Sequence, residues 1–144
     1  MQSILIVIPG CPVAKGRPKL TTVLGHARSY TPEKTRNFEA EIKWISRQEM
    51  AGRVPMKCAL GARINVFLTV PASWSGKKQR AALSGAVVPS KRPDIDNYLK
   101  SVFDGMNQVV YADDALVCDL SMTKRYSDSP RVMVEIYELD GAAA

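Results

Sequence analysis

The chain has 144 residues, of which 46% are hydrophobic, so it is long enough for one compact domain with a buried core. No apolar run approaches the roughly 18 residues that a membrane span needs, and no secretory signal is recognisable at the start. The formal net charge of +6 favours a polyanionic partner, and nucleic acid is the first candidate.

The chain has three cysteines, Cys11, Cys58 and Cys118, which are odd in number and widely spaced. Such a set is not typical of a disulfide framework or of a CxxC metal site. We therefore expect reduced thiols in a cytoplasmic protein that does not associate with membranes.

The N-terminal part of the chain predicts a strand, a basic loop and a helix. The apolar run from Ser3 to Ile8 predicts a strand that is buried on both faces. After the basic loop Lys15–Lys19, we expect two short extended pieces joined by a turn. Apolar residues at helical spacing predict a helix that ends at about Ala51. Thr31 is its expected N-cap, because threonine is a favoured residue at that position.

The rest of the chain predicts a strand, two helices and two further strands. Alternation from Leu60 to Val70 is typical of a half-buried strand, and Ser73 is the expected cap of a short basic helix. Apolar residues at steps of four and three predict a second amphipathic helix from Ile95 to Asn107. Alternation returns after Asp114, and we expect that strand to form an antiparallel hairpin with the last strand, Arg131–Leu139.

This order of elements, β-α-β-α-β-β, predicts an α+β fold. We expect a single domain over residues 1–140, with two main helices packed on a mixed β-sheet. Residues 141–144 are expected to be a loose tail.

The charges are unevenly distributed along the chain. Residues 94–119 contain six aspartates and one cation, Lys100, which makes a segment of net charge −5. Basic segments flank it: residues 77–92 contain five Lys or Arg and no acid. A metal site that faces DNA needs such cations, because they offset the repulsion between carboxylates and phosphates.

Two interpretations of the aspartates compete. Singly, Asp94 is an ordinary N-cap, Asp96 a first-turn acid, and Asp113-Asp114 a turn. Together, Asp94, Asp96 and Asp114 form a candidate metal site, because Mg²⁺ prefers carboxylate oxygens. The cap and the first turn would direct two carboxylates to one place, and Asp114 would join them from the entrance of the next strand. Lys100, one turn after Asp96, is either a surface ion-pair partner or a cation near a reacting phosphate.

Several motifs resemble the RusA-type Holliday junction resolvases, which are small endodeoxyribonucleases of bacteria and phages. The residues that carry the resemblance are Arg92-Pro93-Asp94-Ile95-Asp96-Asn97-Tyr98-Leu99-Lys100, Phe103-Asp104 and Val110-Tyr111-Ala112-Asp113-Asp114-Ala115, with Lys15-Gly16-Arg17-Pro18 and Tyr30-Thr31-Pro32-Glu33-Lys34-Thr35 near the N-terminus. Gln108 and Leu116 depart from the commoner pattern, in which Gly and Gln are frequent.

The resemblance implies a homodimer that resolves four-way DNA junctions by Mg²⁺-dependent phosphodiester hydrolysis in recombination and repair, with Mn²⁺ as a substitute metal. It implies that Asp94, Asp96 and Asp114 bind the metal and that Lys100 is catalytic. Asp113, beside the third ligand, is a candidate for a supporting role.

The basic segments are candidates for contacts with DNA phosphates, and the alternative is a solvated basic face. The candidate residues are Lys15, Arg17, Lys19, Lys77, Lys78 and Arg80. Tyr30 and Trp74 are either stacking partners for unpaired bases or packing residues at the ends of elements.

Two other functions remain open from the sequence. A non-catalytic junction- or DNA-binding protein would explain the basic charge, although not the acidic segment. A metal-dependent hydrolase of phosphorylated small molecules would need the acids, although not both basic segments.

Overall fold

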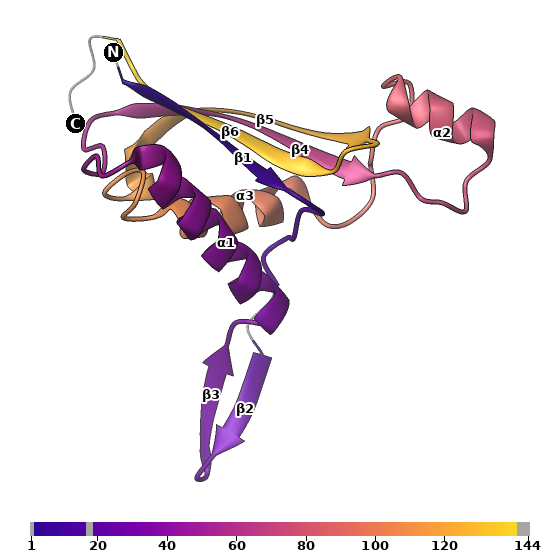
Figure 1. Ribbon diagram of the computed structural model, residues 1–144. Helices are drawn as coiled ribbons and strands as arrows, with labels where there is room; N and C mark the ends of the chain where they lie inside the picture. The colour runs from indigo at the N-terminus through magenta and orange to yellow at the C-terminus, as the bar shows by residue number, and fades with distance from the viewer. Residues whose placement is uncertain (1, 17–18, 141–144) are drawn as a thin grey trace.

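The computed structural model describes residues 2–16 and 19–140, and Figure 1 shows the arrangement of its elements. The strands are β1 (Ser3–Pro9), β2 (Lys19–Val23), β3 (His26–Tyr30), β4 (Leu60–Thr69), β5 (Val117–Ser127) and β6 (Arg131–Glu138). The helices are α1 (Glu33–Met50), α2 (Gly76–Leu83) and α3 (Ile95–Met106), with a short 3₁₀ helix, η1, at Asp114–Leu116. The predicted α+β fold with a mixed sheet is confirmed.

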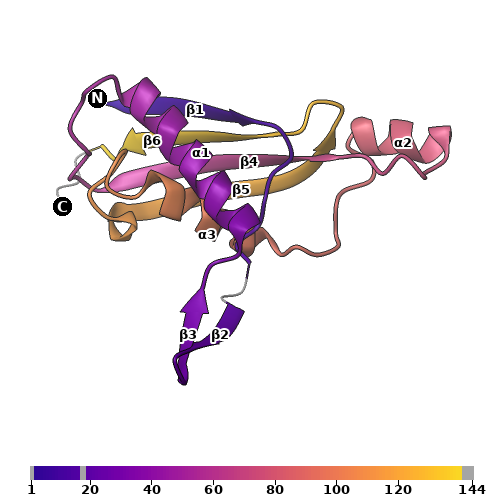
Figure 2. The same ribbon diagram turned by 60° about the horizontal axis from the view of Figure 1, so that its bottom comes forward.

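Four strands form one sheet in the order β1-β6-β4-β5. Neighbouring strands are antiparallel except β4 and β5, which are parallel. The helices α1 and α3 cover one face of this sheet, and the other face carries no helix (Figures 1 and 2). The hairpin β2–β3 projects from the N-terminal end of α1, and α2 lies beyond the end of β4 (Figure 1).

The core lies between the sheet and the two main helices. Its fully buried side chains include Ile6, Ile42, Ile64, Val102, Tyr111 and Ile136. The hydrophobic effect stabilises this layer in proportion to the apolar area that it removes from water.

The prediction that β1 is buried on both faces is wrong. Its residues alternate, so that Ile4, Ile6 and Ile8 are buried whereas Leu5 and Val7 are 52% and 40% exposed. The strand lies at the edge of the sheet, and its apolar run therefore faces the helices on one side only.

The predicted hairpin of the last two strands is also wrong. β6 follows β5 directly along the chain, yet β4 lies between them in the sheet. Burial explains this order: β6 carries Val132, Val134 and Ile136, all fully buried, whereas no residue of β5 is buried. An interior position for β6 places its apolar face under the helices and leaves the polar β5 at the edge.

Two predicted helix starts differ by one or two residues from those observed. The N-cap of α1 is Pro32 rather than Thr31, and the N-cap of α2 is Ser75 rather than Ser73. The Ser75 hydroxyl accepts a hydrogen bond from the backbone N–H of Lys78 at 3.2 Å, as capping serines do. The predicted tail, residues 141–144, lies outside the described residues.

The helices α1 and α3 pack closely at Gly105. A Cβ atom on Gly105 would lie 2.7 Å from Ile42 side-chain carbons and 3.1 Å from the Glu39 carbonyl oxygen. We expect Gly105→Ala to lower the free energy of unfolding by about 1–3 kcal/mol, because it overpacks this contact. Urea unfolding would measure the change.

Gly76→Ala is the matched control, because a Cβ there approaches only the flexible Arg80 side chain. We expect that control to leave the stability unchanged or slightly increased. Equal stabilities for the two variants would contradict the close packing of α1 on α3.

Candidate active site on helix α3

The N-terminal end of α3 presents two exposed carboxylates. Asp94 is the N-cap residue and Asp96 lies in the first turn, as the sequence predicts. The Asp94 side chain makes no capping hydrogen bond, and neither carboxylate pairs with another side chain in the described part of the chain. Both are therefore available to a ligand, at a helix end whose dipole is positive.

Lys100 follows Asp96 by one turn of α3 and is also exposed. Residues four apart share one face of a helix, so its ammonium lies on the side of Asp96. Within residues 2–16 and 19–140, it forms no ion pair with an acid. The interpretation of Lys100 as an ordinary surface ion-pair partner therefore has no support here.

Lys124 of β5 holds the segment that leads to Asp94. Its ammonium donates hydrogen bonds to the carbonyl oxygens of Lys91, at 2.9 Å, and Pro93, at 3.0 Å. Pro93 immediately precedes Asp94, so these bonds restrain the position of the first carboxylate. No sequence pattern indicates this role, because Lys124 lies about 30 residues after Pro93, on a separate strand.

The other pair of acids, Asp113 and Asp114, lies at the turn before β5. The Asp113 carboxylate accepts a hydrogen bond from the Ala115 backbone at 3.4 Å. Burial raises the pKa of the Asp114 carboxyl above its ordinary value, and the neighbouring Asp113 and Asp104 raise it further. Asp114 therefore lies in a partly desolvated, acidic environment, which a cation would stabilise.

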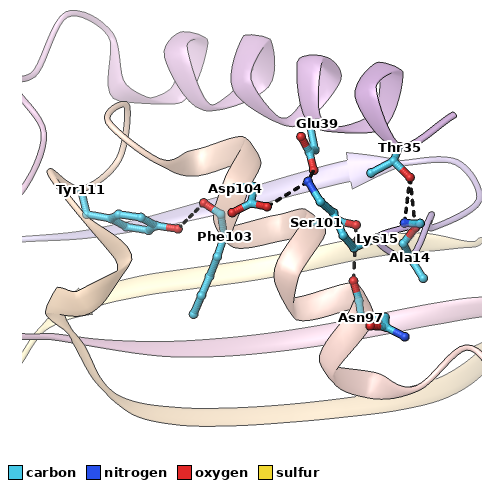
Figure 3. Close-up of polar contacts among 10 residues, drawn as sticks. Ala14, Lys15, Thr35, Glu39, Asn97, Ser101, Phe103, Asp104 and Tyr111 are labelled. Carbon is cyan, nitrogen blue, oxygen red and sulfur yellow. Dashed lines mark hydrogen bonds and ion pairs between the residues drawn. The ribbon is translucent and has the colours of Figure 1, made fainter. Parts of the chain in front are cut away.

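Tyr111 fixes this turn against the C-terminal half of α3. Its ring is fully buried, and its hydroxyl donates a hydrogen bond to the Phe103 carbonyl oxygen at 2.8 Å, as Figure 3 shows. Burial and the nearby acids raise the pKa of the Tyr111 hydroxyl, so it stays protonated and keeps donating. Asp114 is thereby held near Asp104 rather than near Asp94.

The two acidic groups thus lie toward opposite ends of α3. Ten residues separate Asp94 from Asp104, which corresponds to about 15 Å along a helix. Among the described residues, no group of three or more acids, histidines or cysteines is arranged to hold a metal ion. The predicted convergence of Asp94, Asp96 and Asp114 does not occur within one chain.

Lys15 is engaged in ion pairs at the centre of this region. Its ammonium lies 2.5 Å from a Glu39 carboxylate oxygen of α1 and 3.0 Å from an Asp104 oxygen of α3 (Figure 3). Its backbone N–H also donates to the Asn97 carbonyl oxygen at 2.8 Å. These contacts tie the base of the hairpin to both helices, and they favour a structural role over a phosphate contact.

The remaining basic candidates are placed differently. Arg17 lies outside the described residues, and Lys19 begins β2, although its side chain is not described. Lys77, Lys78 and Arg80 are exposed on α2.

The aromatic candidate Trp74 packs against its neighbours. Its ring meets Tyr126 edge-on at 5.3 Å, and the Lys78 ammonium lies 3.9 Å from its centre. These contacts favour packing over base stacking for Trp74. The side chain of Tyr30, the other aromatic candidate, lies outside the described residues.

We expect Lys15→Met to lower the free energy of unfolding by about 1 kcal/mol at neutral pH, because it removes both ion pairs. Burial lowers the pKa of Lys15, but hydrogen bonds and charges from Glu39 and Asp104 outweigh it, and the net shift is upward. The stabilisation is therefore present below the unfolded-state pKa, about 10.4, and is lost as the pH rises through the folded-state value.

Urea unfolding of both proteins between pH 7 and pH 11 (roughly the range that brackets the lysine pKa) would show the difference and its decline. If Lys15 is structural and does not contact phosphates, any affinity for DNA should be the same in Lys15→Met as in the wild type. A variant of wild-type stability that binds DNA more weakly would instead make Lys15 a phosphate contact.

Comparison with known proteins decides the family. Residues 9–137 match the family Endodeoxyribonuclease RusA. The chain belongs to this family. The uncharacterized protein YqaN of Bacillus subtilis (strain 168) is 33% identical over 141 residues, which cover 96% of this chain and 99% of the relative.

Membership of the RusA family indicates endodeoxyribonuclease activity. The matched residues include both acidic groups, Lys100 and Lys124. In the described part of the chain, none of the helices combines the length and the apolar character that crossing a membrane requires.

Proposed function

We propose that this protein is a structure-specific endonuclease that cuts four-way DNA junctions with Mg²⁺, in recombination and repair. The observation that carries the proposal is the N-terminal end of α3. Asp94 and Asp96 present carboxylates there that pair with no side chain of residues 2–16 and 19–140, and Lys100 follows one turn later. In a family of endodeoxyribonucleases, such a set is suited to a phosphodiester.

The donor chemistry of Asp94 and Asp96 fits Mg²⁺. This ion is usually held by one or two protein carboxylates together with phosphate and water. Two exposed carboxylates beside a DNA strand could therefore supply part of its ligand set. Mn²⁺ accepts the same ligands. A bound divalent ion supplies Lewis acidity, which activates water and stabilises a leaving oxygen.

The side chains of this chain have separate parts in the reaction. Asp94 and Asp96 would hold the ion through their carboxylates and orient the strand at the N-terminal end of α3. Lys100 offsets the negative charge that develops on the phosphate during hydrolysis, and removal of such a group typically costs about 100-fold to 1000-fold in rate. Lys124 keeps Asp94 in place through the Lys91 and Pro93 carbonyls.

A second copy of the chain would complete the carboxylate set. Asp114 does not reach Asp94 and Asp96 within one chain, so we propose that it serves the site of a partner in a homodimer. A two-fold axis perpendicular to α3 would run the two copies of this helix in opposite directions and bring the Asp114 end of each toward the Asp94 end of the other. A four-way junction has the same two-fold symmetry.

The edge strand β5 supports this arrangement. It has 11 residues, and its outer edge pairs with no other described strand. Asp114 lies just before its start, and Lys124, which holds the segment before Asp94, lies near its end. Antiparallel pairing of two β5 edges would therefore place each Asp114 beside the opposite acidic pair.

A labelled synthetic four-way junction tests the proposed function. With Mg²⁺, the protein should make paired nicks at symmetric positions, and it should leave a linear duplex of the same sequence intact. Chelation of the metal should stop the reaction while binding persists. Junction binding without cutting in Mg²⁺ or Mn²⁺ would indicate a non-catalytic binding protein, and hydrolysis of free nucleotides alone would indicate a small-molecule hydrolase.

A further inference from the structure

Two depressions follow the line where α1 meets α3. The first has a volume of about 230 Å³ and the second about 290 Å³. The first is lined by residues of both helices, among them Arg36, Lys43 and Asp104. The second lies at the C-terminal ends of the two helices, and Arg47 and Gln108 are among its lining residues. A stretch of hollowed surface therefore runs beside α3 toward the turn that follows it.

Three cations of α1 lie on this side of the helix. Arg36, Lys43 and Arg47 are seven and four residues apart, which places them within about 40° of one another around a helix axis. They are spaced by about 10 Å and about 6 Å along that axis. The fourth cation of α1, Lys34, lines neither depression. We call Arg36, Lys43 and Arg47 the α1 basic stripe.

The α1 basic stripe has no counterion among the described residues. None of its three side chains forms an ion pair with an acid in residues 2–16 and 19–140. The two acids of the first depression, Glu39 and Asp104, are paired instead with Lys15, at 2.5 Å and 3.0 Å. The stripe thus keeps its positive charge, and it attracts an anion.

Arg53, the other cation among the described residues of the second depression, has a structural role. Its guanidinium donates hydrogen bonds to the carbonyl oxygens of Met50, at 3.2 Å, and Glu49, at 3.4 Å. The last carbonyls of a helix have no partner within the helix. Arg53 therefore caps the C-terminal end of α1, which distinguishes it from the stripe.

The α1 basic stripe lies beside the candidate active site. Asp96, Lys100 and Asp104 follow one another at steps of four along α3, so they share one face of that helix. Asp104 also lines the first depression, together with Arg36 and Lys43. The stripe is therefore continuous with the face of α3 that presents the proposed site.

The arrangement of the stripe favours a DNA duplex over a single phosphate or a base. One phosphate is too small to contact both ends of the stripe, which are about 16 Å apart. A duplex instead carries one negative charge per about 1.7 Å of its axis. No aromatic side chain is among the described residues of either depression, so a base has no stacking partner there. Phosphate contacts of this kind position a duplex without regard to its sequence.

The position of the stripe places the contact away from the cut. Arg47 lies by Gln108, which follows Asp96 by 12 residues, or about 18 Å along a helix. That length corresponds to about five base pairs of DNA. We infer that the α1 basic stripe binds a duplex arm of the four-way junction, about five base pairs from the phosphate that is cut. The inference rests on the proposed function for the identity of the substrate.

The test measures binding without a divalent metal, so that no strand is cut. Fluorescence anisotropy over a range of salt concentrations compares two labelled junctions. One has arms of about 15 base pairs, and the other has arms of about 4, which are closed by uncharged linkers and are too short to reach Arg47. In Arg36→Gln/Arg47→Gln, we expect roughly tenfold weaker binding of the long-armed junction and a salt slope that is shallower by about 1.8, because two phosphate contacts are lost. The short-armed junction should bind this variant and the wild type alike.

Two further variants are controls. Lys34→Gln/Lys57→Gln removes the same charge from exposed sites outside both depressions, and we expect the wild-type affinity and slope. Arg36→Lys/Arg47→Lys keeps the charge, so it should retain most of the slope. All three double variants should keep the wild-type melting temperature, because the replaced side chains are exposed.

Three results would overturn the inference. If Arg36→Gln/Arg47→Gln binds the long-armed junction as Lys34→Gln/Lys57→Gln does, the stripe does not contact DNA. If its binding is weakened to the same extent for both junctions, the contact is not with an arm. If it loses affinity for polyglutamate rather than for the junction, the stripe serves an acidic protein.

The outcome is independent of cutting. A wild type that binds through the stripe yet never cuts would contradict the proposed function alone. A cutting enzyme with an inert stripe would contradict this inference alone.

Discussion

Asp96→Asn is expected to lower the rate of junction cutting by more than about 100-fold, because even residues that only orient a metal ligand change activity by 10-fold to 100-fold. Asparagine keeps the size of the side chain and removes its negative charge. Asp96 is exposed in the first turn of α3, so the variant should fold as the wild type does. Single-turnover cutting of a labelled junction measures the rate.

Junction binding separates catalysis from folding in this experiment. Asp96→Asn should bind the junction at least as tightly as the wild type without metal, since it removes a negative charge near the phosphates. Asp119→Asn is the matched control: Asp119 is an exposed aspartate on β5, and we expect cutting at the wild-type rate. Full activity in Asp96→Asn would remove Asp96 from the metal site.

The largest qualitative effect is expected from a mixture of two inactive variants. If Asp114 serves the partner's site, Asp96→Asn and Asp114→Asn each inactivate both sites of a homodimer. In a mixed dimer, however, one site receives both substitutions and the other receives none. Subunit exchange should therefore restore cutting, with about a quarter of the wild-type number of active sites, because half of the dimers are mixed and each has one site.

Mixed dimers should nick one strand of the junction rather than two. The matched control is a mixture of Asp94→Asn with Asp96→Asn, two substitutions at the same end of α3. Each site of that mixed dimer carries one of them, so it should stay inactive. If the first mixture also stays inactive after subunit exchange has been verified, Asp114 does not act in trans.

Local patterns predicted the parts of the fold that depend on neighbouring residues. The helix α3 was expected over Ile95–Asn107 and is observed over Ile95–Met106, because its apolar residues follow the helical period. Asp94 was expected as its N-cap and occupies that position. These features are encoded within one or two turns of chain.

Long-range features were not predictable in the same way. The order of β4, β5 and β6 depends on which apolar faces the helices cover, so adjacency along the chain misled the hairpin prediction. The separation of Asp114 from Asp94 depends on Tyr111, which anchors the turn to Phe103. Lys124 was missed because its contacts with Lys91 and Pro93 join segments about 30 residues apart.

The placement of the acids at opposite ends of α3 has a consequence for the living cell. On the proposed dimeric site, a solitary chain holds no complete carboxylate set and is harmless to DNA. Well below the dimer dissociation constant, the rate of cutting should rise with the square of the chain concentration rather than in proportion to it. The cellular concentration of the chain would then control its activity. At low concentration the chains would be monomeric and would not cut DNA, and increased synthesis would produce active dimers.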